Sequence, residues 1–423
     1  MTHIKYILVI VFFFFTLQYT CKAQVFNDCI IDPNVKTVQL YTNTNQLSPP
    51  VIILNSTDFL TIEFDILYNS IIDLQYTIFL CDKNWYKSEL LPNEYIQTIG
   101  LLEFESGEHS INTSIPYIHY KTSFPNNSIQ FLLSGNYIIQ VFDEHTKQIL
   151  LQKRFQVVEP LVSIQALQRR PNTVDLMDTH QAVDINISWE NIPIVNQINQ
   201  LQVLVQQNNR WDNCKWYTKP THIYMQSIKF TTEPYNCFYG NAEFRQFNFK
   251  NMRFAGQYIR RIDWENGIYK IYLEPNEFQA FKPYANTKDL NGKFLPSHEI
   301  SATDASTVAD YAYVHFTIQY TKQIYDTLDI YVVGGFNSWS ITDENKMIYN
   351  NQTNMYEAAI LLKQGYYNYS LAFVSHDKKH IFTHEIEGSY NKTENRYDIF
   401  VYYYDISKGY DRIIGYQTIE QTK

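Results

Sequence analysis

Two histidines near the end of the chain, His380 and His384, have the side-chain type of metal ligands. The segment around them reads as β-strand, and in a strand a spacing of four residues separates two Cα atoms by about 13 Å. A zinc ion holds its ligand atoms only about 2 Å away, so one ion cannot bind both side chains. We therefore expect two solvent-facing histidines and no metal site.

A second polar group, Asp143-Glu144-His145, has the residue types of an acid/base site. It follows directly after an alternating apolar run, where charged turns are common, so a solvated turn is the better explanation. Nucleophile elbows, glycine-rich phosphate loops and paired-histidine helices are absent from the sequence, and Gly334-Gly335 is too short to cradle a phosphate. The sequence therefore predicts no catalytic, metal-binding or cofactor-binding residue, and no enzyme.

Four cysteines lie beyond the first residues of the chain, and they allow two local disulfides. Cys29 with Cys81, or Cys214 with Cys237, would each close a loop within one domain in an oxidising compartment. Unpaired buried thiols are an equally good explanation, because four cysteines are few for a chain of this length. None of the four has zinc-ligand spacing.

The N-terminus has the features of a secretory signal. Lys5 precedes an unbroken apolar stretch from Tyr6 to Leu17, and the exit at Cys21-Lys22-Ala23 suggests cleavage before Gln24. The apolar stretch is shorter than the roughly 20 residues that span a bilayer, and no later segment is longer or cleaner. Cys21 would carry a lipid anchor in a lipoprotein, but Thr20 before it argues against that alternative. We expect a signal peptide over residues 1–23 and an exported mature protein without a membrane span.

The composition favours strands and argues against nucleic acid as a partner. The formal charge of −9 becomes −11 once Lys5 and Lys22 leave with the signal, and no Lys/Arg stripe interrupts the chain. Aromatic residues make up 16% of the sequence, led by 35 Tyr and 27 Phe. At 423 residues, with 45% hydrophobic content, the chain is long enough for two to four domains.

Alternating apolar residues mark strands along the whole chain, as in Leu60–Ile66 and Leu74–Leu80, which we expect to be half-buried. Tyr356–Leu362 and Tyr367–Phe373 flank the turn Lys363-Gln364-Gly365, which predicts a hairpin. Short strands separated by turn residues predict an all-β protein of three tandem immunoglobulin-like or early-set β-sandwich domains. We place these domains at residues 24–160, 161–308 and 309–423. The middle domain ends in an extended loop, and a membrane barrel is not favoured.

Several short motifs resemble those of the type IX secretion system plug proteins of Bacteroidetes. They occur in the same order over nearly the whole mature chain, whereas Asn241-Ala242 departs from an expected Ala-Gly-Asn-like run. The motifs in the first domain are Cys81-Asp82-Lys83-Asn84-Trp85, Ser88, Glu94-Tyr95, Tyr117-Ile118-His119-Tyr120, Pro125-Asn126 and Ser134-Gly135-Asn136-Tyr137. Those further on are Gln207-Asn208-Asn209-Arg210-Trp211, Glu243-Phe244-Arg245, Asp310-Tyr311, Val314-His315-Phe316, Glu387-Gly388-Ser389, Thr393-Glu394-Asn395, Asp411-Arg412 and Ile414-Gly415.

The resemblance implies a periplasmic protein that caps the periplasmic mouth of a large outer-membrane translocon barrel and seals it when no cargo is engaged. It implies no enzyme activity and no cofactor. The partner would be the translocon barrel, and the residues that contact it are not identified by the motifs.

The third domain suggests an alternative of another class. Its segment from Val333 to Trp339 is similar to early-set sandwiches related to glycogen-binding modules, in which Trp339 would stack on a sugar ring of a carbohydrate ligand. A single aromatic side chain does not make a stacking platform, so packing of Trp339 at the sandwich edge is the simpler explanation.

Overall fold

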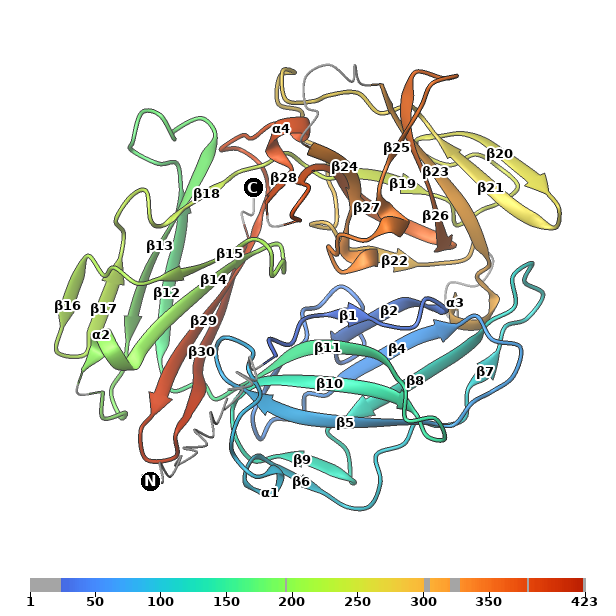
Figure 1. The fold of residues 1–423 in the computed structure, drawn as a ribbon. Helices are drawn as coiled ribbons and strands as arrows, with labels where there is room; N and C mark the ends of the chain where they lie inside the picture. Colours follow the sequence, from blue (N-terminus) through green and yellow to red (C-terminus); the bar gives the residue numbers. More distant parts are fainter. Residues whose placement is uncertain (1–23, 195, 300–304, 320–327, 379, 421–423) are drawn as a thin grey trace, which may run out of the picture.

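The computed structural model describes residues 24–194, 196–299, 305–319, 328–378 and 380–420. The predicted signal peptide and Cys21 lie outside these residues. The described chain is almost entirely β-structure, which confirms the all-β prediction, and its sheets form three sandwiches around three large hydrophobic cores. Figure 1 shows the first sandwich below, the second at the left and the third at the upper right.

The first sandwich packs the sheet β1-β11-β10-β5, with β3 parallel to β11, against the sheet β2-β4-β8-β7. A short ribbon, β6-β9, and helix α1 lie at its lower end (Figure 1). The bounds are β1 Cys29–Ile30, β2 Val35–Thr42, β3 Val51–Ile53, β4 Leu60–Ile66, β5 Leu74–Cys81, α1 Pro92–Tyr95, β6 Ile96–Thr98, β7 Glu108–His109, β8 Ile118–Phe124, β9 Ile129–Phe131, β10 Gly135–Asp143 and β11 Ile149–Val158.

The second sandwich packs the sheet β12-β13-β17-β16, with β18 on β13, against β15-β14-β29-β30. Its last two strands come from the end of the chain, shown in red in Figure 1. The bounds are β12 Ser163–Arg169, β13 His180–Ser188, α2 Gln197–Gln200, β14 Leu201–Gln207, β15 Cys214–Tyr217, β16 His222–Tyr224, β17 Ser227–Phe230, β18 Cys237–Tyr239, β29 Arg396–Asp405 and β30 Tyr410–Glu420.

The third sandwich packs the sheet β20-β21-β23-β26-β25 against β27, which pairs with β19, β22, β24 and β28. Its short helices lie in the connections. The bounds are β19 Arg245–Asn248, β20 Ile259–Glu265, β21 Ile268–Leu273, β22 Phe294–Pro296, α3 Ala305–Val308, β23 Tyr311–Gln319, β24 Leu328–Val333, η1 Gly335–Asn337, η2 Asp343–Asn345, β25 Ile348–Asn350, β26 Met355–Lys363, β27 Gly365–Ser375, β28 Ile381–Phe382 and α4 His384–Glu387.

The sheets do not follow the predicted boundary between residues 308 and 309. Strands β19 to β22 precede it but pair within the third sandwich, whereas β29 and β30 follow it and belong to the second. Strand β29 pairs with β14 from Leu201 opposite Tyr403 to Gln207 opposite Tyr397. This pairing buries apolar side chains of β29 in the second core, so the third sandwich is an insertion between two parts of the second.

The predicted hairpin at Lys363-Gln364-Gly365 is wrong in its pairing. Both strands exist as β26 and β27, but β26 pairs with β23 and β25, and β27 lies in the opposite sheet. Only Gln364 separates the two strands, and it is buried, so the chain turns a corner from one sheet to the other.

Candidate partner-binding surface

A buried ionic cluster joins the first sandwich to the third. Asp65 Oδ2 accepts hydrogen bonds from Lys363 Nζ at 2.7 Å and from Tyr311 OH at 2.6 Å, and Asp65 Oδ1 lies 2.8 Å from His119 Nδ1. Asp65 is 0% exposed and Lys363 is 1% exposed. The Lys363 ammonium also lies 4.2 Å from the ring centroid of Tyr117. Three side chains from two sandwiches therefore surround one carboxylate, and a fourth, Tyr117, packs against the lysine.

Burial alone would raise the pKa of Asp65, but the Lys363 charge and the hydrogen bond with His119 hold that pKa below its usual value. Strand β4 is buried along its whole length rather than on one face. On the polar face of β4, Asp65 is covered by side chains of the third sandwich, whereas Glu63 is paired with Gln46 and Lys121 of the first sandwich.

The first and second sandwiches share a small hydrophobic cluster and several polar contacts. Val158 of the first packs with Phe400 and Tyr402 of the second, and the Tyr402 hydroxyl donates to Asn136 Oδ1 at 2.9 Å. The backbone amide of Lys83 donates to Asp411 Oδ2 at 3.0 Å. Lys83, Asn136 and Asp411 belong to the motifs Cys81 to Trp85, Ser134 to Tyr137 and Asp411-Arg412, respectively.

All three sandwiches meet around stacked cations and aromatic rings. The Arg154 guanidinium lies 4.5 Å from the ring centroid of Trp85 and 4.9 Å from that of Trp211. The Arg210 guanidinium lies 4.1 Å from the ring centroid of Trp339. Lys153 Nζ donates to Ser338 Oγ at 3.0 Å and so connects the first sandwich directly to the third. These contacts hold the three sandwiches in one arrangement.

The ring of Trp339, the candidate sugar-stacking residue, is partly buried and packs against three neighbours. Arg210 covers its ring, Phe244 lies 5.7 Å away between centroids, and Gly292 approaches so closely that a Cβ there would lie 2.6 Å from Trp339 Cζ2. Gly292 also has a φ of +81°, a conformation that favours glycine. The packing explanation for Trp339 therefore agrees with the structure better than the carbohydrate alternative.

Replacing this side chain tests the packing role. We expect Trp339→Ala to lower the free energy of unfolding by about 3 kcal/mol, because it opens a void where three sandwiches meet. Urea unfolding measures this effect. The control is Trp264→Ala, which should have a milder effect because Trp264 is 55% exposed. The packing role would be contradicted if the unmodified protein bound to immobilised starch and the Trp339→Ala variant did not.

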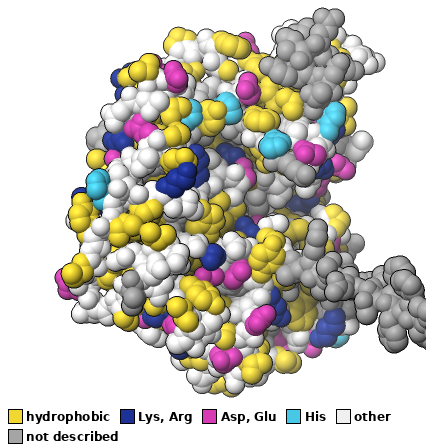
Figure 2. Space-filling view, turned by 60° about the vertical axis from the view of Figure 1, so that its left-hand side comes forward, with side chains coloured by type: hydrophobic (Ala, Val, Ile, Leu, Met, Phe, Trp, Pro, Cys, Tyr) yellow, Lys and Arg dark blue, Asp and Glu magenta, His cyan; other side chains and the backbone are white. Residues whose placement is uncertain are grey.

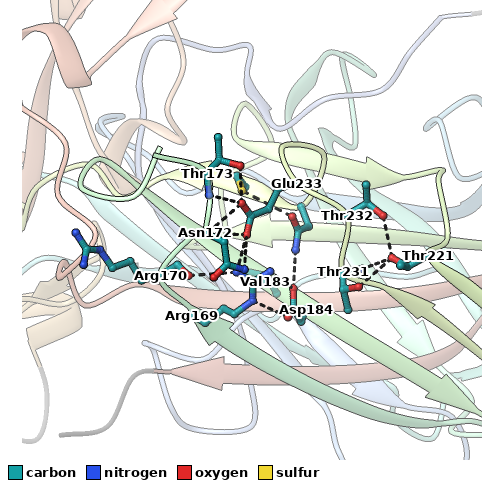
Figure 3. A network of polar contacts seen from close by, with 12 residues as sticks. Arg169, Arg170, Asn172, Thr173, Val183, Asp184, Thr221, Thr231, Thr232 and Glu233 are labelled. Atoms are coloured by element: carbon teal, nitrogen blue, oxygen red, sulfur yellow. Dashed lines mark hydrogen bonds and ion pairs between the residues drawn. The ribbon is translucent and has the colours of Figure 1, made fainter. Parts of the chain in front are cut away.

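A polar network fixes the loop after β12 to the loop before β18 (Figure 3). Arg169 Nε donates to Asp184 at 2.7 Å, and Arg169 Nη1 donates to Glu233 at 2.6 Å. Glu233 also accepts the backbone amides of Asn172 at 2.9 Å and of Thr173 at 2.8 Å. Burial acts to raise the pKa of Glu233, but these donors lower it to about 2. We assign this network a structural role.

Two segments connect the second and third sandwiches, one before β19 and one after α4, and Glu243 lies where they run together. Its carboxylate accepts from the Tyr284 hydroxyl and, at 3.1 Å, from the backbone amide of Glu394. Burial raises the pKa of Glu243 to about 7, and burial likewise raises the pKa of Asp289 to about 6. Both carboxyl groups thus bind protons more tightly in the folded chain than in the unfolded chain.

These pKa shifts predict a pH dependence of stability. Because both pKa values are raised on folding, stability is highest below the unfolded pKa near 4 and falls as pH rises through 6 and 7. We expect Glu243→Gln combined with Asp289→Asn to flatten the decline in melting temperature between pH 5 and 8. An unchanged decline in this double variant would show that other groups control it.

The lower end of the first sandwich presents exposed apolar side chains along α1, β6 and the adjoining loops. Leu91 is 64% exposed, Ile99 66%, Leu101 70% and Leu132 43%. Ile99 and Leu132 directly follow the paired strands β6 and β9, and their amides donate to the carbonyls of Ser128 and Tyr95. Leu91 directly precedes α1, and Leu101 lies two residues after Ile99. Large apolar side chains grouped at a surface are typical of protein–protein contact sites. We call these four residues the apolar end.

The apolar end has an acidic surround. Residues 88–120 contain five glutamates and no Lys or Arg, and the exposed side chains include Glu89, Glu94, Glu103 and Glu105. Figure 2 shows hydrophobic and acidic side chains, with some Lys and Arg, at the lower end of the molecule. Such a surface is complementary to a partner with apolar and basic side chains.

The residues singled out for chemistry do not come together. Asp143 is the last residue of β10, and its carboxylate accepts hydrogen bonds from the backbone amides of His145 at 2.8 Å and Thr146 at 2.6 Å in the turn that follows. His380 is exposed, whereas His384 is partly buried and stacks on Tyr239 with ring centroids 4.0 Å apart. Among the residues that the structure describes, no group of three or more His, Cys, Asp or Glu side chains could hold a metal ion.

All four cysteines are free thiols in the structure, and the members of each possible disulfide pair lie on different strands. Cys29 and Cys81 lie on β1 and β5, at opposite edges of one sheet with two strands between them. Cys214 and Cys237 lie on β15 and β18, in opposite sheets of the second sandwich. Burial raises the pKa of Cys81 to about 12 and that of Cys214 to about 11, so both thiols stay protonated near neutral pH.

Sequence reasoning missed the Asp65–Lys363 cluster and the apolar end. The alternation in Leu60–Ile66 placed Asp65 on a polar face, which we assigned to solvent. The stretch 88–120, which contains no Lys or Arg, was a signal for the acidic surface.

None of the described helices is long and apolar enough to cross a membrane.

Comparisons with known proteins identify the family. The model for the first domain of type 9 secretion system plug proteins matches residues 35–159, which cover most of the first sandwich. The crystal structure of a hypothetical protein from Parabacteroides merdae is similar over 94% of this chain and 100% of that one, with 32% identity and a TM-score of 0.90. No curated protein matches the chain. The chain belongs to the type 9 secretion system plug protein family.

Proposed function

We propose that this chain is a non-enzymatic subunit of the type IX secretion system that binds the periplasmic mouth of the outer-membrane translocon barrel. There it seals the barrel while no cargo is engaged, after export into the periplasm on a cleaved signal peptide. The observation that carries this proposal is the match of residues 35–159 to the first domain of plug proteins.

The contacts between sandwiches support a sealing role. A barrel wide enough for folded cargo leaks small solutes unless a broad and rigid body blocks it. The buried Asp65–Lys363 pair and the Trp339–Arg210 stack resist hinge motion between sandwiches, since each would have to break before the sandwiches could separate.

The apolar end is the docking face that we propose for the rim of the barrel. A stable protein–protein interface buries on the order of 1,000 Å² or more, with apolar side chains at its centre and charged side chains at its edge. Leu91, Ile99 and Leu101 provide such a centre, and the surrounding glutamates provide the edge.

Deletion of the gene tests the sealing role. We expect the deletion strain to secrete cargo but to become sensitive to a glycopeptide antibiotic too large for ordinary porins, because the empty translocon stays open. A plasmid copy of the gene should restore resistance. Unchanged sensitivity in a strain whose translocon is present and without cargo would contradict the proposal.

A further inference from the structure

A cavity of about 360 Å³ lies in the third sandwich beside the segments that lead to the second. Four tyrosines line it, Tyr258, Tyr284, Tyr369 and Tyr390, together with Pro275 and Pro283 of the loop after β21. This volume lies within the range of small-ligand sites in proteins. The partner-binding face proposed above lies on another sandwich, so the cavity has no part in that role.

Asn276 leaves a hydrogen-bond donor unused at this cavity. The side chain is 6% exposed, and its Oδ1 accepts from Arg245 Nη1 at 2.9 Å and from Tyr369 OH at 2.9 Å. Since a guanidinium only donates, the oxygen must face Arg245 and the amide nitrogen must point elsewhere. That nitrogen is buried and has no partner among the described residues. An unpaired buried donor destabilises the folded chain, and a ligand acceptor would offset that cost.

The wall of the cavity is acidic. Glu243, Glu274, Glu277 and Glu387 line it, and among the described lining residues Arg245 is the only Lys or Arg. The Arg245 guanidinium is fully used, because Nε donates to both Glu387 oxygens at 2.9 Å and Nη2 donates to the Glu277 carbonyl at 2.7 Å. Glu274 is exposed and forms no ion pair within the described part of the chain.

We propose that this cavity binds a basic residue of an extended peptide segment. The backbone carbonyl of that residue accepts the hydrogen bond from Asn276 Nδ2. Its ammonium or guanidinium group lies beside Glu274 and against the tyrosine rings, where cation–π attraction adds to the ionic attraction. Glu387 is paired with Arg245 and Glu277 with Lys282, so a neutral side chain would leave Glu274 without a counter-charge. A bare cation would leave the Asn276 amide unpaired.

Saturation-transfer NMR on the purified mature protein tests this site with small probes. We expect N-acetyl-arginine methylamide and N-acetyl-lysine methylamide to bind. The neutral isostere N-acetyl-citrulline methylamide should bind at least tenfold more weakly. Agmatine, which keeps the guanidinium but lacks the carbonyl, should also bind at least fivefold more weakly than the arginine probe.

Variants separate this cavity from other acidic surfaces. Glu274→Gln and Tyr258→Ala change exposed side chains of the wall and should each weaken the arginine probe at least fivefold. Glu190→Gln changes an exposed carboxylate of the second sandwich and should have no effect. Equal binding of the arginine and citrulline probes, equal binding of agmatine, or no binding at 10 mM probe would each overturn the proposal. The assay contains no translocon, so its outcome is independent of the sealing role.

Discussion

Asp65→Ala is expected to lower the free energy of unfolding by about 3–5 kcal/mol, the largest effect that we predict for a single substitution. The substitution leaves the Lys363 ammonium buried without a counter-charge, and it removes the acceptor of the Tyr311 hydroxyl. Urea unfolding followed by circular dichroism measures the change. Asp343→Ala, which removes the exposed partner of Lys378, is the matched control and should leave stability nearly unchanged.

A double variant separates charge from folding. Asp65→Leu with Lys363→Met replaces the ion pair by apolar side chains and should recover most of the stability lost in Asp65→Ala. Because the pKa of Asp65 is held below its usual value, the ionic contribution persists at neutral pH and is lost only as pH falls below about 4. Stability of Asp65→Ala within 1 kcal/mol of the unmodified protein would contradict the role of this cluster.

Replacing Leu91, Ile99 and Leu101 together by Asp is expected to weaken binding to the translocon at least 100-fold. The change removes the apolar centre of the proposed docking face and adds three negative charges to a surface that already carries exposed glutamates. Pull-down of the translocon from detergent-solubilised outer membranes measures the loss.

The matched control for the docking face replaces three equally exposed apolar side chains elsewhere, Val174, Ile348 and Ile406, by Asp. Both triple variants should keep the melting temperature of the unmodified protein, because all six side chains are mostly in solvent. Normal translocon retention by the Leu91, Ile99 and Leu101 variant would show that the barrel binds another face.

The sequence predicted the strands better than their partners. Alternation in Leu60–Ile66 and Tyr356–Leu362 correctly identified β4 and β26, because a period of two residues follows from strand geometry alone. It did not show that β29 pairs with β14, since that pairing joins segments almost 200 residues apart. The hairpin at Gln364 failed for the same reason, because local pattern does not determine which sheet a strand joins.

The candidate site was even less visible in the sequence. Asp65 and Lys363 each look like ordinary solvent-facing charges, and only the packing of two sandwiches makes them a buried pair. Leu91 and Leu101 look like core residues, yet both are exposed in the segments on either side of α1 and β6. Trp339 packs beside Arg210, a partner that the sequence did not indicate.

Affinity purification of the tagged protein from detergent-solubilised outer membranes, followed by mass spectrometry, tests the central claim most directly. We expect one very large outer-membrane barrel as the main partner, recovered in a stoichiometric amount with the unmodified protein and lost with the Leu91, Ile99 and Leu101 variant. Recovery of no barrel, or of glycan-utilisation proteins in its place, would contradict it.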